Sequence, residues 1–273
     1  MQKIFVLCCF VAVSTVAQTQ VVQVDHLRIA GNAAHEMADF FANTIGLPAS
    51  WGKNSSKDEL MAVVWMGNMA VYLSGRNRDA ENNKATTIAL KAIQHEDTLV
   101  RLLDEYGINY AAPVPVTTFQ QLDAKAVCSD FPLKDLGEEN FSVVIAEYRF
   151  PDFILEKRKQ AKKLLEQVDG GKLGIRSVKE IIIGSRDPQK SIHSWISVPG
   201  IRRKEGNRFS FFTGPDIVIE AADRDEIKEI VIKVTSLQTA KDFLLAKKLL
   251  VPDGNKTLIS PEKTAGFRVL LEE

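Results

Sequence analysis

Alternating apolar residues open four successive stretches of the chain, at residues 24–30, 86–90, 178–184 and 227–233. Such alternation predicts β-strands. Each opening is followed by a short polar turn, a segment with the apolar spacing of a helix, and then further strand-like runs. A pattern that recurs along a chain is typical of repeated supersecondary units. The sequence therefore predicts four β-α-β-β-β modules.

Local signals support this division. In the first module the expected helix spans residues 33–45, and Gly46 follows it at the position where glycine commonly ends a helix. In the third module, Asp187 and Pro188 have the order expected at a helix start. The clearest internal repeat is the match between residues 178–183 (VKEIII) and 227–232 (IKEIVI).

A single module of this kind leaves one face of its curved sheet uncovered, whereas two modules side by side form a half-barrel around a cleft. We therefore expect an α+β protein in which four βαβββ modules pair into two half-barrels. The expected boundaries are residues 20–153 for modules one and two, 154–174 for a helix and linker, and 175–273 for modules three and four.

The first residues predict export rather than part of the fold. Lys3 precedes an apolar run over residues 4–13, and small residues around Ala17 suit a cleavage site. This pattern is typical of a signal peptide, which we assign to residues 1–19. The expected destination is the periplasm or the extracellular space. Cleavage would leave Cys128 as the one cysteine of the mature chain, and no later stretch of sequence is long and apolar enough to span a membrane.

The composition of the chain argues against a nucleic-acid partner. The chain has 273 residues, of which 45% are hydrophobic and 26% charged, as expected for a globular protein. Basic and acidic residues number 35 each, which gives no basic excess for a nucleic-acid partner. The main basic run, residues 156–163, has helical spacing and is predicted to be a solvated helix face. A small molecule is therefore the expected ligand.

The first opening, Val24-Asp25-His26-Leu27, and the run FFANTIGLP over residues 40–48 resemble the glyoxalase/bleomycin resistance protein/extradiol dioxygenase superfamily, also called the vicinal oxygen chelate superfamily. Residues 99–108, with the Pro-Val-Pro run at 113–115, resemble a second module of the same kind. The resemblance covers nearly all of the mature chain and implies a glyoxalase-like fold. It is less specific for activity, because this fold hosts many unrelated functions.

The resemblance also implies where a metal would bind. Metal-using members place ligands on the first and last strand of each module. In the first half-barrel these positions fall on His26, Ser74 (or Tyr72), Thr87 and Glu147. His26 and Glu147 match as metal ligands, with Glu147 also in the catalytic role. The other positions depart from the pattern. The implied cofactor is a divalent ion such as Zn, Ni, Mn or Fe, and the absence of any cofactor is equally compatible with the departures.

The corresponding positions of the second half-barrel are all glutamates, namely Glu180, Glu220, Glu229 and Glu272. Four inward carboxylates would repel one another unless a hard cation lay between them. Alternatively they are outward charges beside neighbouring lysines. The lack of histidine at these positions argues against extradiol ring cleavage, for which the family uses two histidines and a glutamate there.

Three functions remain open from the sequence. The first is a metal-dependent lyase or isomerase of glyoxalase type, acting on a small carbonyl or enolisable substrate through His26 and Glu147. The second is a non-catalytic small-molecule-binding protein that uses the same cleft without a metal. The third is a structural role in which side chains fill both clefts. The departures at Ser74 and Thr87 favour the second and third.

Overall fold

The computed structural model describes residues 21–53, 59–76, 85–92, 96–117, 123–125, 127–137 and 140–273. The predicted signal peptide, residues 1–19, lies outside the described residues.

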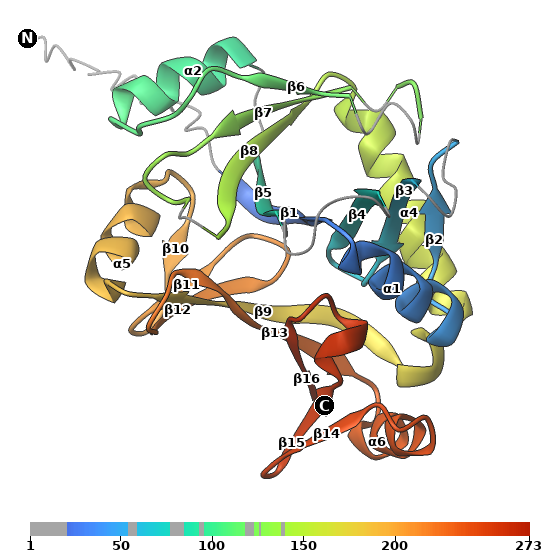
Figure 1. Ribbon diagram of the computed structural model, residues 1–273. Helices are drawn as coiled ribbons and strands as arrows, with labels where there is room; N and C mark the ends of the chain where they lie inside the picture. Colours follow the sequence, from blue (N-terminus) through green and yellow to red (C-terminus); the bar gives the residue numbers. More distant parts are fainter. Residues whose placement is uncertain are drawn as a thin grey trace, which may run out of the picture.

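Two eight-stranded sheets form the framework, and each is built from two consecutive modules (Figure 1). The strand order of the first sheet is β2-β3-β4-β1-β5-β8-β7-β6. Its strands are β1 (Val21–Ala30), β2 (Ala49–Trp51), β3 (Glu59–Trp65), β4 (Ala70–Arg76), β5 (Ala85–Ala92), β6 (Val114–Val116), β7 (Cys128–Pro132) and β8 (Ser142–Tyr148). The opening strands β1 and β5 run antiparallel at the centre, so the two modules meet there.

The second sheet repeats this order as β10-β11-β12-β9-β13-β16-β15-β14. Its strands are β9 (Ile175–Ser185), β10 (Arg202–Arg203), β11 (Arg208–Ser210), β12 (Asp216–Ala221), β13 (Glu226–Val234), β14 (Leu250–Asp253), β15 (Lys256–Ile259) and β16 (Arg268–Glu272). In both sheets the first and last strands of each module pair in parallel. The predicted α+β class, with four βαβββ modules paired into two half-barrels, is confirmed.

In the described residues, each module carries one α-helix after its opening strand, and a further helix, α4, joins the two halves. The helices are α1 (Ala33–Asp39), α2 (Glu96–Glu105), α4 (Pro151–Gln167), α5 (Pro188–Ser197) and α6 (Leu237–Ala246). The helix expected over residues 33–45 continues after α1 as a π-helical turn, Phe40–Thr44. The Asp187 carboxylate caps α5 by accepting a hydrogen bond from the Lys190 backbone N–H. Within the described part of the chain, no helix combines the length and the apolar character needed to cross a bilayer.

A single buried apolar cluster includes side chains from both sheets and from their helices. On β1 the cluster takes Val24 and Leu27, and on β9 it takes Val178 and Ile181. Burial of apolar area on this scale is the main stabilising contribution to a fold. The two halves therefore share one core.

The opening strands of three modules contain a β-bulge at equivalent positions. In β1, Val24 lies opposite Leu90 and His26 opposite Ala89, so Asp25 is an additional residue. The register shifts in the same way at Lys179 of β9 and at Lys228 of β13. A bulge turns two consecutive side chains toward one face of a sheet. The three bulges therefore present Asp25-His26, Lys179-Glu180 and Lys228-Glu229 on the faces opposite the shared core.

The two half-barrels meet closely where the β3–β4 turn packs on β9. The side-chain amide of Asn68 donates a hydrogen bond to the Val178 carbonyl at 2.8 Å and accepts one from the Val178 backbone N–H at 2.9 Å. Gly67 precedes it with a φ of +83°, and an added Cβ would lie 2.1 Å from the Arg176 carbonyl oxygen. Glycine is thus required here both by conformation and by space.

We expect Gly67→Ala to lower the free energy of unfolding by about 2–5 kcal/mol. The left-handed backbone would contribute about 1–2 kcal/mol and the steric overlap about 1–3 kcal/mol. Gly107→Ala is the matched control, since Gly107 has a φ of +64° and nothing within 4 Å of an added Cβ. Urea denaturation of both variants measures the difference, and equal losses would contradict the close junction.

Candidate functional site

The helix α4 packs on the face of the first sheet that lies opposite the shared core. We call this the α4 face. Its apolar part comprises Ala89, Cys128, Val144, Ala146 and Tyr148, which form one cluster with Ile154 of α4. In Figure 1, α4 runs beside the strands of the first module. The bulge in β1 turns Asp25 and His26 toward this face, beneath the helix.

Asp25 is the centre of a buried polar network on the α4 face. Its carboxylate lies 2.7 Å from His26 Nδ1 and accepts a hydrogen bond of 2.7 Å from the Tyr148 hydroxyl. It also forms an ion pair with the Arg158 guanidinium of α4. Asp25 is 1% exposed and His26 is 0% exposed. Buried charges require such partners because desolvation of an unpaired ion is costly.

The second ring nitrogen of His26 is also engaged. Arg28 Nε donates a hydrogen bond of 2.8 Å to His26 Nε2. Nδ1 therefore carries the proton and donates to Asp25, because a neutral imidazole has one donor and one acceptor nitrogen. Arg28 in turn forms a bidentate ion pair with Asp130, with Nη2 donating to Oδ1 at 2.6 Å. The Tyr72 ring packs edge-on against His26, with centroids 4.5 Å apart.

Burial and neighbouring charges set the protonation states of this network. Burial lowers the pKa of His26 from 6.5 to about 4, against the opposing hydrogen bond with Asp25. Burial alone would raise the pKa of Asp25, but the Arg158 charge and the hydrogen bonds from His26 and Tyr148 hold it well below its usual range. Burial raises the pKa of the Tyr148 hydroxyl well above its usual value. At neutral pH the network thus contains ionised Asp25 and neutral His26.

These charges leave no place for a divalent ion at His26. The two guanidinium groups, on Arg28 and Arg158, balance the two carboxylates on Asp25 and Asp130. An added ion would leave two uncompensated positive charges in a buried site, which is strongly unfavourable. It would also have to displace Arg28 from the Nε2 lone pair. The described residues contain no group of three or more His, Cys, Asp or Glu side chains arranged to hold a metal.

Tyr148, rather than Glu147, is the β8 residue that meets His26. Along β8, Val144 and Ala146 belong to the α4 face, whereas Val143 and Ile145 belong to the shared core. Strand alternation then places Tyr148 on the α4 face and turns Glu147 the other way. The metal and catalytic roles assigned to Glu147 stay predictions. At the positions that depart from the family pattern, the Tyr72 ring packs edge-on against His26, and the Thr87 and Ser142 hydroxyls share a hydrogen bond of 2.8 Å.

Like Arg28, Asp130 and Tyr148, Arg158 is a network residue that the sequence did not indicate. It falls in the charged run predicted to be a solvated helix face, yet only 20% of its side chain is exposed. Its partner Asp25 lies 133 positions earlier. The sequence did contain a signal of the bulge in the opening strand. The apolar residues Val24 and Leu27 are three positions apart, whereas regular strand alternation would space core residues by two.

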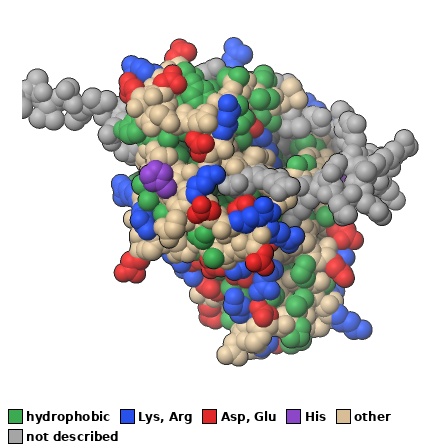
Figure 2. Space-filling view, turned by 60° about the vertical axis from the view of Figure 1, so that its left-hand side comes forward, with side chains coloured by type: hydrophobic (Ala, Val, Ile, Leu, Met, Phe, Trp, Pro, Cys, Tyr) green, Lys and Arg blue, Asp and Glu red, His purple; other side chains and the backbone are tan. Residues whose placement is uncertain are grey.

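In the second half-barrel, each of the four candidate glutamates pairs with a basic side chain. Glu180 lies 2.7 Å from Arg208, and Glu220 lies 2.6 Å from Lys228. Lys179 Nζ lies 2.6 Å from Glu272. Glu229 pairs with Arg268 at 3.3 Å. The set therefore consists of ion pairs and not of a cluster of free carboxylates. On the face shown in Figure 2, acidic and basic side chains are likewise intermingled.

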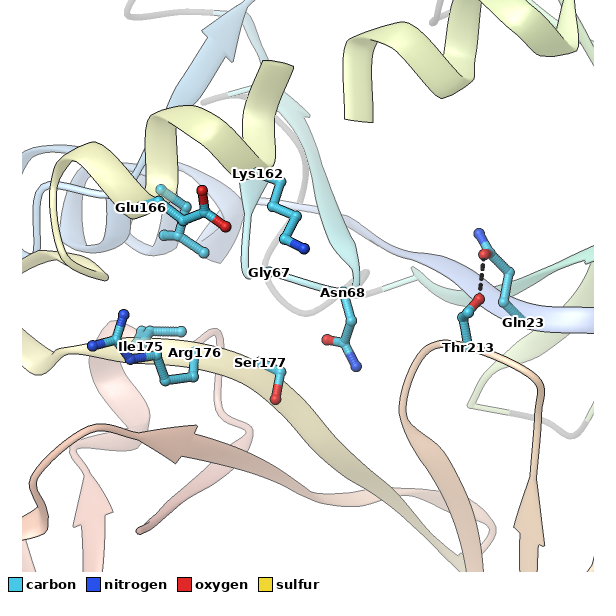
Figure 3. A pocket seen from close by; sticks show the side chains of 10 residues that line it. Gln23, Gly67, Asn68, Lys162, Glu166, Ile175, Arg176, Ser177 and Thr213 are labelled. Atoms are coloured by element: carbon cyan, nitrogen blue, oxygen red, sulfur yellow. Dashed lines mark hydrogen bonds between the residues drawn. The ribbon is translucent and has the colours of Figure 1, made fainter. Parts of the chain in front are cut away.

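A cavity of about 450 Å³ lies where the two half-barrels and α4 meet, and we call it the junction pocket. Figure 3 shows Lys162 and Glu166 extending from α4 on one side and residues of β9 on the other. Its lining includes Gln23, Asn68, Lys162, Leu165, Ser177 and Thr213. The Thr213 hydroxyl donates to the Gln23 side-chain oxygen at 2.7 Å, and Gln23 Nε2 donates to Asp25 at 3.1 Å. The pocket thus adjoins the buried network.

Comparison with known proteins supports the fold. No protein-family model matches the chain, and no curated protein matches its sequence. Among solved structures, a hypothetical protein from Staphylococcus aureus matches with a TM-score of 0.61 and 10% identity, covering 93% of this chain and 99% of the other. The Mn(II)-bound glyoxalase from Novosphingobium aromaticivorans matches with a TM-score of 0.56 and 13% identity, covering 93% and 82%.

A dioxygenase shares the same architecture. The 2,2',3-trihydroxybiphenyl 1,2-dioxygenase from Sphingomonas wittichii strain RW1 matches with a TM-score of 0.56 and 14% identity, covering 92% of this chain and 90% of the other. At these identities the similarity concerns the fold and not the activity. It confirms the glyoxalase-like fold that the resemblance at residues 24–27 and 40–48 implied.

We expect the free energy of unfolding to decrease as the pH is lowered, because His26 takes up a proton more readily in the unfolded chain than in the folded chain. Between its usual pKa of 6.5 and its folded pKa of about 4, the unfolded chain binds a proton that the folded chain does not. Stability is therefore lost as pH falls from about 7 to about 4.5, by about 2–3 kcal/mol from this residue. Urea denaturation at both pH values should show a smaller loss in His26→Gln than in the parent. The exposed-site control His193→Gln should retain the full loss.

If His26→Gln does not fold, NMR titration of the His26 ring in the parent chain gives the same information. A folded-state pKa near 6.5 would contradict the buried network.

We also expect Arg158→Met to be strongly destabilising, by about 3–5 kcal/mol, because it leaves Asp25 buried without its cation. Lys159→Met, which removes an exposed pair with Glu156, should cost about 1 kcal/mol or less. Adding Asp25→Asn to Arg158→Met should recover part of the loss. Chemical denaturation of the parent, Arg158→Met, Asp25→Asn and the double variant measures the coupling, and additive effects would contradict the pair.

Proposed function

We propose that this chain, which has the glyoxalase-like, vicinal-oxygen-chelate fold, is a small-molecule-binding protein that works without a metal ion and without catalysis. The observation that carries the proposal is the junction pocket of about 450 Å³. Ligand pockets commonly have volumes of about 300–1,000 Å³ and occur between domains. The pocket combines polar groups from Gln23 and Ser177 with apolar Leu165.

The alternative of a metal-dependent lyase or isomerase fits the described residues less well. That chemistry requires a divalent ion to polarise the substrate oxygen, with a nearby carboxylate to move a proton. His26 engages both ring nitrogens within the protein, and α4 packs over the face on which it lies. The metal that the Novosphingobium glyoxalase binds therefore has no fitting counterpart here.

The alternative of a purely structural role fits only part of the molecule. On the α4 face, Ile154 of the helix packs into the apolar cluster of the sheet, as that role predicts. The junction pocket remains as a cavity of ligand size elsewhere. We therefore place binding in the junction pocket rather than in the cleft of the first half-barrel. Export through residues 1–19 belongs to the same proposal and would direct binding to a ligand outside the cytosol.

The proposal predicts that a small organic ligand raises the thermal midpoint of the purified mature protein, and that a chelator leaves this shift unchanged. Ser177→Trp should fill the pocket and abolish the shift, because a bulky ring would occupy the ligand volume. Ser50→Trp is the matched control, since Ser50 is an exposed strand residue outside the pocket lining. A thermal-shift screen measures both.

Metal content of the same samples should be measured after incubation with Mn, Zn, Ni and Fe salts. A full equivalent of bound metal that is lost in His26→Ala would overturn the metal-free proposal. A ligand shift that survives in Ser177→Trp would place binding elsewhere.

A further inference from the structure

We propose that the ligand of the junction pocket is a small organic anion with a short apolar portion, of the monocarboxylate type, and that Lys162 is its counter-ion. This rests on the proposed binding function and assigns the chemistry of that site. The assignment of an anion depends on which polar groups of the lining already have partners within the protein and which can still bind a ligand.

Most polar lining groups are already engaged. Both polar atoms of the Asn68 amide bond the Val178 backbone. The Gln23 side chain bonds Asp25 and Thr213. Groups committed in this way can shape a pocket, but they contribute little new hydrogen bonding to a ligand. Recognition therefore falls to the charged side chains.

The charged side chains in the lining are Lys162, Glu166 and Arg176, a set with two cations and one carboxylate. Arg176 forms an ion pair of 2.8 Å with Asp169. Among the described residues, Lys162 has no ion-pair partner. Figure 3 shows its side chain extending from α4 into the space between the helix and β9, whereas Glu166 lies farther along the helix on the side of the pocket where Arg176 also lies. An anion placed at Lys162 would thus provide the ion-pair partner that this side chain lacks among the described residues.

The surroundings of Lys162 suit an apolar portion. Leu165 is 5% exposed and Ile175 is 0% exposed, and both line the pocket as parts of the shared core. Ser177 lies on β9, across the pocket from the helix, and its hydroxyl points away from Lys162 (Figure 3), so Lys162 is the group that meets the anionic head. A single cation beside an apolar wall favours a ligand with one negative head and a hydrocarbon body over a polyanion or a sugar.

Three probes of equal chain length test this assignment, namely hexanoate, hexanol and hexylamine. By isothermal titration calorimetry at low salt, we expect hexanoate to bind most tightly and hexylamine least. Lys162→Gln should weaken hexanoate binding by about three- to fivefold, as expected for a partly exposed ion pair, and should leave hexanol binding unchanged. Added salt should weaken binding of the anion alone.

Two variants serve as controls. Lys163→Gln removes the neighbouring lysine, which does not line the pocket, and should leave hexanoate binding as in the parent. Glu166→Gln should leave it equal or tighter. Equal binding of hexanoate and hexanol that is lost in Ser177→Trp would overturn the anion assignment while the binding function stands. Tightest binding of hexylamine would overturn it likewise. Failure of all three probes at millimolar concentration would overturn both proposals.

Discussion

The β-bulge in the opening strands is the constraint on which the rest of the structure depends. An unbulged strand would direct Asp25 and His26 to opposite faces, so one of them would enter the shared apolar core. The bulge keeps both on the α4 face and leaves Val24 and Leu27 in the core. Because equivalent bulges occur in β9 and β13, the repeated motif conserves a backbone distortion while the residues at it differ.

The charges around the β1 bulge determine whether His26 can bind a metal ion. In the glyoxalase-like pattern this position would present a metal ligand. Here the surrounding carboxylates are neutralised by guanidinium groups, and the imidazole completes a hydrogen-bonded chain from Arg28 to Asp25. A hydrogen-bonded network of this kind rigidifies a structure, and among the described residues its Arg158 Nε is buried without a hydrogen-bond partner. The position that would hold a metal ligand therefore serves to hold α4 on the sheet, and the junction pocket lies beside the helix.

Much of the fold was predictable because strands and helices leave local signals. The four openings and the Asp187 cap appear in the sequence as alternation and as turn residues. The candidate site was less predictable because its members are brought together by tertiary structure. Assigning Glu147 required strand register to one residue, and a one-residue difference exchanges faces. Arg158 looked like any lysine or arginine of a solvated helix until its distant partner was placed.

The dependence of Asp25 on Arg158 also bears on how the chain is synthesised. The carboxylate leaves the ribosome 133 residues before the guanidinium that neutralises it. All eight strands of the first sheet precede α4 in the chain, so the sheet can be assembled while its central buried charge is still uncompensated. Completion of the first half-barrel therefore has to wait for the helix. A fragment that ends at residue 153 would contain every strand of that half-barrel and still lack the residue that makes it stable.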